Sequence, residues 1–367
     1  MRIDIATLFT QMCGGVLNES IVGRGIRNGF IEVHTHDIRK YTENKHRRVD
    51  DKPYGGGTGM LMQAQPVYDC ISAIKSQGEG KPRIIYMSPQ GEVLTQQKVQ
   101  ELAQEPWLIL LCGHYEGIDQ RVLDELEVEE LSVGNYVLTG GELPALIVAD
   151  AVARLQPGVL PNEDAYSIES HYNGLLEFPQ YTRPEEWHGR RVPEVLLTGD
   201  HRTVTEWQNR EALRVTAKKR PDMYGKFIAE QHERLWSAFL EDKDIPPETR
   251  CSGVVRFGKT ADEADRLAKL VMRGKKRADL SVQSGELPRR GEYLIVTDGA
   301  GLGKCVVQVF NVKTVPFSGV TEEMCGFTAE CSSPDEWRAV QEADISAETP
   351  VAFWQFRLVY KYHKEER

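Results

Sequence analysis

The stretch LSVGNYVLTGGELP, residues 131–144, combines two kinds of backbone signal. β-Forming residues on both sides of Gly134 predict two short strands joined by a glycine turn. Gly140 and Gly141 then supply flexible backbone ahead of the apolar run from Leu143 to Leu155, which predicts a helix. The expected order is therefore strand, turn, strand, glycine turn and helix.

Two other glycine turns follow short apolar strands. The strand predicted at 84–87 runs into SPQG, and the strand predicted at 108–112 runs into GHYEG. Ligands of α/β folds bind at the carboxyl ends of strands, so these three turns could wall a pocket for a flat, polar ligand such as an adenine nucleoside. Glycine content alone does not separate this hypothesis from ordinary turns of an α/β domain.

Length and composition limit the class of protein. The 367 residues, 40% of them hydrophobic, suffice for two or three domains with apolar cores. There is no run of about 18 apolar residues to predict a membrane span, and the charged start does not predict a signal peptide. The seven cysteines form no CxxC pair, as is typical of reduced thiols. We expect a cytoplasmic protein with no membrane partner.

The formal charge of −10 argues against sequence-independent coating of nucleic acid, which needs a basic surface. Basic clusters nevertheless occur at 39–40, 45–48, 190–191, 218–220 and 275–277. Each cluster by itself is more typical of a solvated surface than of a phosphate site.

Apolar strands alternate with helical spacing through the first 155 residues. Strands are predicted at 3–9, 30–36, 84–87 and 108–112, and helices at 16–27, 65–74, 96–103 and 121–125. This alternation indicates a mostly parallel sheet, for which a Rossmann fold is the plain interpretation. Residues 157–173 lack a pattern and predict a flexible linker or a lid, and residues 206–219 have helical spacing.

Two pairs of potential metal ligands stand alone. His34 and His36 lie on one face of a predicted strand, and Cys325 and Cys331 lie near the other end of the chain. Neither pair has a second pair at zinc spacing, so a structural role is the favoured interpretation.

Five motifs in one order carry a resemblance to a known family. They are DDKPYGGGTGMLM at 50–62, SPQG at 88–91, CGHYEGID at 112–119, SVGNYVLTGGELPA at 132–145 and GLLEFPQYTRP at 174–184. From Met1 to about Phe227 the chain resembles TrmD, the bacterial tRNA (guanine-N1)-methyltransferases of the SPOUT class. The resemblance implies an α/β SPOUT fold with a trefoil knot. It also implies a homodimer that methylates guanosine 37 of tRNA, the nucleotide 3′ of the anticodon.

The catalytic residues follow from the same resemblance. Guanine N1 holds a proton at neutral pH, so its methylation needs a base, and a cation should stabilise the charge that develops at O6. Glu169 stands where the family carries an aspartate before a serine, which makes it the expected base, with Asp164 as the alternative. Glutamate keeps the carboxylate and adds a methylene. Arg154 matches the arginine that the family uses at O6 or the nearby phosphate.

The implied methyl donor is S-adenosylmethionine, bound by one chain of the dimer while the other chain supplies the base. The family's use of Mg²⁺ points to the carboxylates of Glu116, Glu169 and Glu177. Donor contacts are expected at Tyr86, Met87, Ser88, Pro89, Gly113, Tyr115, Glu116, Ser132, Val133, Gly134, Asn135, Tyr136, Val137, Leu138, Gly140, Gly141 and Pro144.

Contacts with tRNA are expected outside the donor pocket. The long loop at 37–62 is implied to hold the target guanosine, and the Asp50 carboxylate is expected to accept from guanine N1–H and N2–H. His114 stands where many relatives carry arginine, so RNA contact there should be weaker. The expected RNA-binding residues are Asp50, Gly55, Gly59, His46, Ser170, Arg183, Lys218, Lys219 and Lys276.

The segment after Phe227 resembles a second family. FGKTADEADRLAKLVMRGKKRAD at 257–279 and VPFSGVTEEM at 315–324 are similar to the ASCH domain, a small β-barrel related to PUA modules, over roughly 230–362. A helix capped by Thr260 and closed by Gly274 is predicted there, with strands at 291–297, 304–315 and 351–360.

ASCH domains are inferred to bind RNA, and some relatives hydrolyse modified cytidine through the lysine and threonine of a GxKxxT motif. Asp279 replaces that threonine here, so we expect binding and not catalysis. A purely structural appendage is the alternative.

Four segments are predicted. They are a SPOUT methyltransferase domain at 1–160, a flexible linker at 161–175, a small helical tRNA-binding domain at 176–228 and an α+β ASCH-like domain with a leading helix at 229–367. The alternative to a methyltransferase is a non-catalytic RNA-binding protein whose Glu169 cannot reach the base.

Overall fold

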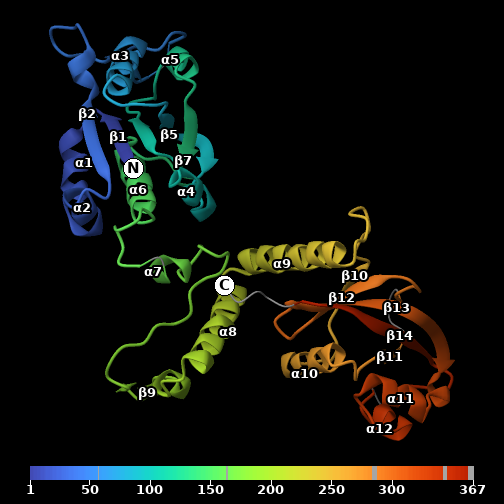
Figure 1. The fold of residues 1–367 in the computed structure, drawn as a ribbon. Coiled ribbons are helices and arrows are strands. Elements are labelled where there is room, and N and C mark those ends of the chain that lie inside the picture. The colour runs from blue at the N-terminus through green and yellow to red at the C-terminus, as the bar shows by residue number, and fades with distance from the viewer. Residues whose placement is uncertain (57, 163, 283–286, 342–344, 363–367) are drawn as a thin grey trace. The chain divides into compact units, whose positions relative to one another are not determined.

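The computed structural model describes residues 1–56, 58–162, 164–282, 287–341 and 345–362, and it omits the side chains of residues 164 and 165. The chain forms two compact units, Met1–Asn173 and Gly174–Arg367. Figure 1 shows both units with their helices and strands labelled. Among the described residues, no helix combines the length and the apolar character that crossing a membrane requires.

The first unit is built on a five-stranded parallel sheet in the order β2-β1-β6-β5-β7. Its strands are β1 (Arg2–Thr7), β2 (Glu32–Asp37), β5 (Arg83–Val93), β6 (Trp107–Cys112) and β7 (Glu129–Ser132), and a separate hairpin pairs β3 (Asp50–Asp51) with β4 (Leu61–Met62). Every residue of β6 is buried, as expected of a central strand covered on both faces. The predicted parallel sheet is confirmed.

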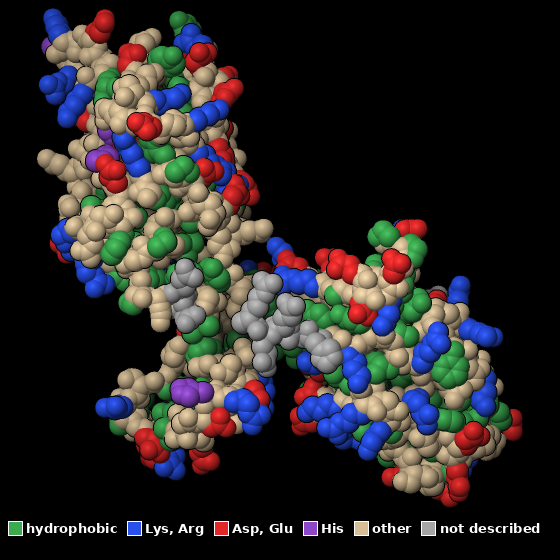
Figure 2. Space-filling model, viewed as in Figure 1, with side chains coloured by type: hydrophobic (Ala, Val, Ile, Leu, Met, Phe, Trp, Pro, Cys, Tyr) green, Lys and Arg blue, Asp and Glu red, His purple; other side chains and the backbone are tan. Residues whose placement is uncertain are grey.

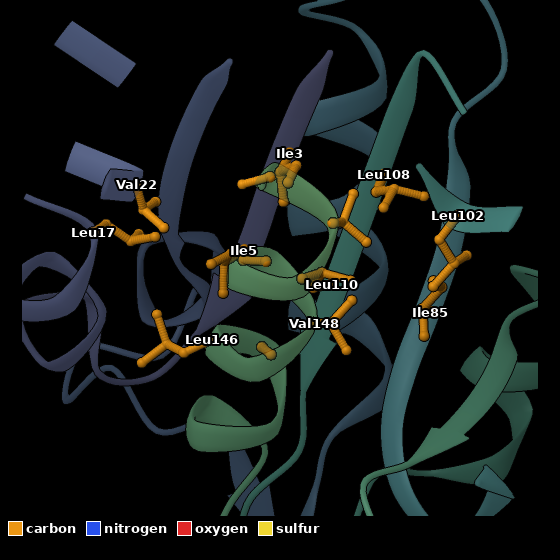
Figure 3. Packing of buried hydrophobic residues seen from close by; sticks show 14 of the residues in the cluster. Ile3, Ile5, Leu17, Val22, Ile85, Leu102, Leu108, Leu110, Leu146 and Val148 are labelled. Atoms are coloured by element: carbon orange, nitrogen blue, oxygen red, sulfur yellow. The ribbon is translucent and has the colours of Figure 1, made fainter. Parts of the chain in front are cut away.

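Helices cover both faces of this sheet and give two separate cores. The helices are α1 (Thr10–Leu17), α2 (Ser20–Arg27), α3 (Ala64–Lys75), α4 (Gln96–Leu102), α5 (Gln120–Glu125), α6 (Glu142–Ala153) and α7 (Asp164–Ser167), with a 3-10 turn η1 (Ile38–Tyr41). One core joins α1, α2, α4 and α6 to the sheet, and the other joins α3, α5 and η1 to the opposite face. Figure 3 shows Leu146 and Val148 of α6 among Ile5 and Leu110 of the strands.

Two local predictions for the first unit are wrong. The helix expected at 16–27 is two helices, because the Asn18 side chain and backbone N–H both bond the Gly14 carbonyl and end α1. The second strand expected within 131–138 does not form, since β7 ends at Ser132. Val137 is 82% exposed there. Its high β propensity does not produce a strand, because β propensity depends on packing against a neighbouring strand.

A buried charge network ties the first strand to its neighbours. The Asp4 carboxylate, fully buried, accepts hydrogen bonds from Arg2 Nε at 2.7 Å and Trp107 Nε1 at 2.7 Å, and it lies 2.7 Å from His36 Nε2. Burial raises the pKa of Asp4, but the bonds from His36, Arg2 and Trp107 outweigh it and lower the pKa below its usual value. The structural interpretation of His36 agrees with this contact.

Replacing Asp4 with asparagine is expected to lower the free energy of unfolding by about 3 kcal/mol, because Arg2 and His36 lose a buried partner. Since the folded pKa is lowered, the stabilisation is present above the unfolded pKa of about 3.9 and is lost as the pH falls through the folded value. Urea denaturation at several pH values measures both effects. Glu32→Gln, which removes an exposed partner of His34, is the control and should change stability by less than about 1 kcal/mol.

The second unit begins with two long helices. Its first part contains β8 (Glu186–Trp187), β9 (Arg190–Arg191), the 3-10 turn η2 (Glu194–Leu197), α8 (His201–Lys219) and α9 (Pro221–Asp242). Helix α9 continues through the domain boundary predicted at residue 228. Its later part packs Leu235 and Phe239 against Ile295 and Val306 of the following sheet.

The rest of the second unit is a five-stranded sheet in the order β10-β12-β13-β14-β11, curled as a half-barrel. Its elements are β10 (Gly253–Val255), α10 (Ala261–Met272), β11 (Ala278–Val282), β12 (Tyr293–Thr297), β13 (Gly303–Pro316), η3 (Phe317–Gly319), α11 (Glu322–Thr328), α12 (Pro334–Ala339) and β14 (Pro350–Lys361). Thr260 caps α10 as predicted, in a capping box with Glu263. The sheet order is open, so the β-barrel expected here is present as a half-barrel.

Candidate functional site

A pocket of about 210 Å³ opens in the first unit where β6 and β7 end, beside Tyr86 to Pro89 in the middle of β5. All three glycine segments identified in the sequence contribute to its wall. The turn predicted at SPQG is wrong, because these residues lie within β5, where the register with β7 shifts between Met87 and Glu92. Of the expected donor-binding residues, all except Gly134 and Asn135 line it: Tyr86, Met87, Ser88, Pro89, Gly113, Tyr115, Glu116, Ser132, Val133, Tyr136, Val137, Leu138, Gly140, Gly141 and Pro144. The parallel sheet brings the turns together because all of its strand ends lie at one edge.

Close backbone contact explains why glycine occupies the turns. The Gly141 N–H donates to the Gly113 carbonyl at 2.9 Å, and a Cβ on Gly141 would lie 2.8 Å from Cys112 Cα. A Cβ on Gly113 would lie 2.7 Å from the Tyr86 ring. Two turns that are far apart in the sequence therefore touch through their main chains, and side chains are excluded from the floor of the pocket.

Sequence reasoning missed two buried residues under this floor. Thr7 Oγ1 donates to Glu142 Oε1 at 2.8 Å, and the Phe9 N–H donates to Thr7 Oγ1 at 2.9 Å. Glu142 is the first residue of α6, where the helix dipole favours a negative charge. Burial, with a smaller contribution from the charge of Glu142, raises the pKa of Cys13 to about 11. Thr7 could have been found, because it ends the strand beside β6 at the same edge.

The pocket wall also contains residues that the sequence analysis had not assigned to it. They are His114, Gly117, Leu131 and Thr139. All four lie inside the sequence motifs already quoted. They could have been predicted because each is a neighbour in sequence of residues that were expected to line the pocket. His114 forms an isolated backbone bridge with Gly140, which makes it part of the wall as well as a candidate RNA contact.

The loop expected to hold the guanosine packs beside the pocket. The Glu116 N–H donates to the Met60 carbonyl at 3.0 Å, and the Met62 N–H donates to the Gly117 carbonyl at 3.0 Å. Gly59 adopts a φ of +98° and lies against the Glu116 side chain. Asp50 opposes Met62 in the β3–β4 hairpin. The loop is therefore anchored at its end, and Gly55 with a φ of +86° and the exposed His46 lie within it.

The two expected catalytic residues are bonded to each other. Arg154 Nη1 donates to Glu169 Oε2 at 2.6 Å, and Arg154 Nη2 donates to Glu169 Oε1 at 2.9 Å. About one third of each side chain is exposed. The bidentate bond lowers the pKa of Glu169 against an opposing effect of burial, and it raises the pKa of Arg154. No sequence pattern indicated this pairing, and the side chain of Asp164 lies outside the described part of the chain.

The remaining expected RNA contacts are divided between the two units. Ser170 follows Glu169 at the end of the first unit and is half-buried, whereas Arg183, Lys218 and Lys219 are exposed in the second unit. Lys218 and Lys219 form the last turn of α8, where the helix dipole favours cations.

Lys276 requires a correction. Its side chain is fully buried, and its ammonium donates to the Ala278 carbonyl at 2.9 Å and pairs with Asp279 at 3.2 Å and with Glu330. The ammonium also lies 4.4 Å from the centre of the Phe257 ring. The prediction that Lys276 contacts RNA is wrong in this structure, because two carboxylates hold the charge inside the second unit.

No cluster of three or more His, Cys, Asp or Glu side chains that could hold a metal ion occurs among the described residues. His34 instead contacts Glu32 at 2.6 Å, and Thr328 Oγ1 lies 3.8 Å from Cys331 Sγ.

Comparison with known proteins gives matches to both parts of the chain. The family described as "tRNA (Guanine-1)-methyltransferase TrmD" matches residues 1–226, and the ASCH domain family matches residues 253–360. A protein of Ruminiclostridium cellulolyticum is 53% identical over 226 residues, which cover 62% of this chain and 97% of the relative. Proteins of Anoxybacillus flavithermus and Lachnospira eligens are 47% and 48% identical over 64% of this chain and 96% and 100% of their own. All three relatives are named tRNA (guanine-N(1)-)-methyltransferase.

Proposed function

The chain belongs to the TrmD family of tRNA (guanine-N1)-methyltransferases, and from that premise we propose that it transfers a methyl group from S-adenosylmethionine to N1 of guanosine 37 in tRNA. It is an enzyme of the methyltransferase class, with a second, ASCH domain. The observation that carries the proposal is the pocket at the strand ends, whose glycine floor excludes side chains. We further propose that the first unit has the SPOUT fold with its trefoil knot.

The pocket suits the donor because it offers bare main chain and few charges. A Cβ at Gly113 would clash with the Tyr86 ring and one at Gly141 with the Cys112 backbone, so glycine lets the two turns approach and present main chain to a flat base and ribose. When bound, the donor supplies an electrophilic methyl group on a sulfonium. In the proposal, Tyr86 to Pro89 and Ser132 to Leu138 hold and orient the donor, and the Glu116 carboxylate faces its positive charge. Gly134 and Asn135 contribute through their backbone.

In the proposed mechanism Glu169 is the base and Arg154 is the cation, and each leaves the other to contact the guanine. Glu169 would accept the proton from guanine N1, and Arg154 would stabilise the negative charge that develops at O6. In the structure each satisfies the other, and the bond to Arg154 lowers the basicity of Glu169. Moving the guanidinium from Glu169 to O6 would raise the basicity of the carboxylate at the moment when it is needed. Asp50, Gly55, Gly59 and His46 would hold the nucleotide.

The wider assembly is proposed on the same basis. Ser170, Arg183, Lys218 and Lys219 would contact tRNA, and the ASCH domain would bind RNA. The Mg²⁺ that the family uses would be held by carboxylates such as Glu116, with the substrate supplying other ligands. We expect the protein to act in the cytoplasm, where tRNA is found.

A homodimer is supported by an apolar surface on the first unit. Met12 and Val16 on α1 and Leu143 and Ile147 on α6 are each 45–49% exposed, and each pair is spaced to lie on one face of its helix. Helices α1 and α6 pack side by side, and in the proposal the four exposed side chains belong to one apolar interface with the second chain.

Replacing Ile147 with lysine is expected to weaken self-association by about 100-fold or more, because a buried interfacial charge costs several kcal/mol. Methyl transfer should fall with it if one chain supplies the base to the other. Sedimentation velocity and a methyl-transfer assay at matched concentrations measure the two effects. Tyr68→Lys is the control, since Tyr68 is 40% exposed on α3 at the opposite face of the sheet. Equal dimer affinity for both variants would contradict the proposal.

The test of the function is transfer of labelled methyl from S-adenosylmethionine to unmodified tRNA transcript. We expect incorporation into the natural transcript and none when adenosine replaces the guanosine at position 37. Tight tRNA binding without any methyl incorporation would favour the non-catalytic RNA-binding protein, for which the closed Arg154–Glu169 pair is the supporting observation.

A further inference from the structure

A β-bulge in the second unit projects an aromatic ring into solvent. In the pairing of β13 with β14, Val309 lies opposite Phe356 and Asn311 lies opposite Gln355, so Phe310 is the extra residue. Phe310 is 45% exposed. Bulges re-aim side chains, and the exposed part of the phenyl ring is not stabilised by burial in the fold.

The ring borders a pocket of about 280 Å³ whose wall also includes Phe327, Gln355, Arg277 and Arg357. Backbone bonds hold this wall in place. The Arg277 N–H donates to the Phe327 carbonyl at 2.8 Å, and the Arg277 carbonyl accepts from the Phe356 N–H at 2.9 Å. Asn311 Nδ2 donates to Gln355 Oε1 at 2.9 Å, which leaves the Gln355 amide N–H₂ as the end able to donate to a ligand.

The charge around the pocket is positive. The Arg277 guanidinium lies 5.2 Å from the centre of the Phe327 ring, and Arg357 donates to Gln308 Oε1 at 2.6 and 3.1 Å. Neither arginine forms an ion pair within the described part of the chain, and no Asp or Glu lines the pocket. The nearby acids Asp279 and Glu330 are held by Lys276. Figure 2 shows Lys and Arg side chains gathered on the visible face of the second unit.

We propose that this pocket binds an unpaired nucleotide of RNA, with its base stacked on Phe310 and its flanking phosphates on Arg277 and Arg357. Exposed aromatic rings beside unpaired arginines form the usual platform for single-stranded nucleic acid. Protein interfaces are also enriched in aromatic residues and Arg, but a wall whose two arginines form no ion pair among the described residues, and which contains no Asp or Glu, favours a polyanion. The inference rests on the RNA binding proposed above for the ASCH domain, and it names the site and the kind of RNA element.

The first test uses the full chain and a fluorescent single-stranded RNA oligonucleotide of mixed sequence, with binding followed by anisotropy. Phe310→Leu keeps an apolar side chain but removes the stacking surface, so affinity should fall about tenfold. Phe310→Trp keeps a stacking surface and should bind like the unaltered chain. Equal affinity of Phe310→Leu and the unaltered chain would overturn the proposal.

The second test separates phosphate contact from general charge. Arg357→Gln should weaken oligonucleotide binding and reduce the salt dependence of log K by about 0.7, the value for one phosphate contact on a single strand. Arg290→Gln makes the same charge change at an exposed residue outside the pocket and should leave the slope unchanged. Equal slopes for the two variants would exclude phosphate binding by Arg357.

Failure of this inference can be distinguished from failure of the proposed function. If the unaltered chain methylates tRNA but Phe310→Leu binds RNA normally, only the pocket assignment is lost. If oligonucleotide binding depends on Phe310 but no methyl transfer occurs, the pocket stands and the methyltransferase proposal fails. If Phe310→Leu changes self-association in sedimentation and leaves RNA binding intact, the pocket docks protein and the inference is overturned.

Discussion

Replacing Glu169 with glutamine is expected to lower kcat for methyl transfer by about 10²–10⁴-fold, the usual contribution of a general base. Glutamine has nearly the same shape but cannot accept the guanine N1 proton. Stability should change by less than about 1 kcal/mol, because the Arg154–Glu169 pair is about one third exposed. Single-turnover methyl transfer with saturating tRNA measures the chemical step, and thermal unfolding measures the stability.

Two further variants make this prediction specific. Glu169→Asp restores the residue that the family usually carries and should retain most of the activity if the carboxylate is the base. Glu194→Gln removes an exposed carboxylate to which the proposal gives no role, and it should leave the chemical step unchanged. If Glu169→Gln keeps full single-turnover activity, the base lies elsewhere, and Asp164 becomes the candidate.

The pH dependence of Glu169 gives an independent measure of its bond to Arg154. The guanidinium lowers the pKa of Glu169, so in the free chain the carboxylate remains ionised to a pH below its usual value. Arg154→Met removes the hydrogen bonds, and the pKa should rise toward or above the usual value near 4.3. Titration of the Glu169 carboxyl carbon by NMR follows the shift directly. An unchanged pKa in the variant would show that the pair is broken in solution.

The parallel sheet and its pocket were predictable because local signals agree with the fold. The continuous apolar run of Trp107–Cys112 indicates a strand buried on both faces, and strand order then brings the glycine turns to one edge. The donor-binding residues at these turns stay predictions, although most of them line the pocket. The motifs predicted the lining of the pocket because each one contributes several residues that are consecutive in the sequence.

The ion pairs that individual side chains form with residues elsewhere in the sequence were not predictable. Lys276 sits in a basic run that is typical of a solvated surface, yet its ammonium is neutralised by Glu330, which is 54 residues away. Arg154 and Glu169 are separated by a segment without regular pattern, so nothing in the sequence indicated their bidentate bond. Val137 shows the converse, since a strong β-former stays exposed when no strand lies beside it.

Replacing Gly141 with alanine is expected to weaken binding of S-adenosylmethionine by about 100-fold or more. The new Cβ would lie 2.8 Å from Cys112 Cα and 3.0 Å from the Gly113 nitrogen, and both are backbone atoms that cannot rotate away. The turn must therefore move, which breaks the 2.9 Å bond from the Gly141 N–H to the Gly113 carbonyl. Overpacking and the lost bond together cost about 3 kcal/mol, which corresponds to roughly 100-fold in affinity.

Two further variants, Gly140→Ala and Gly225→Ala, are expected to weaken binding of S-adenosylmethionine less than Gly141→Ala does. A Cβ on Gly140 would meet Glu142 Oε2 and the His114 ring, which are side-chain atoms able to shift, so its effect should be smaller than that of Gly141→Ala. A Cβ on Gly225 in α9 would meet nothing within 4 Å, so donor affinity should not change. Calorimetric titration with S-adenosylmethionine, after circular dichroism has confirmed folding, gives the three affinities. A loss for Gly140→Ala as large as for Gly141→Ala would mean that backbone contact between the two turns does not shape the donor site.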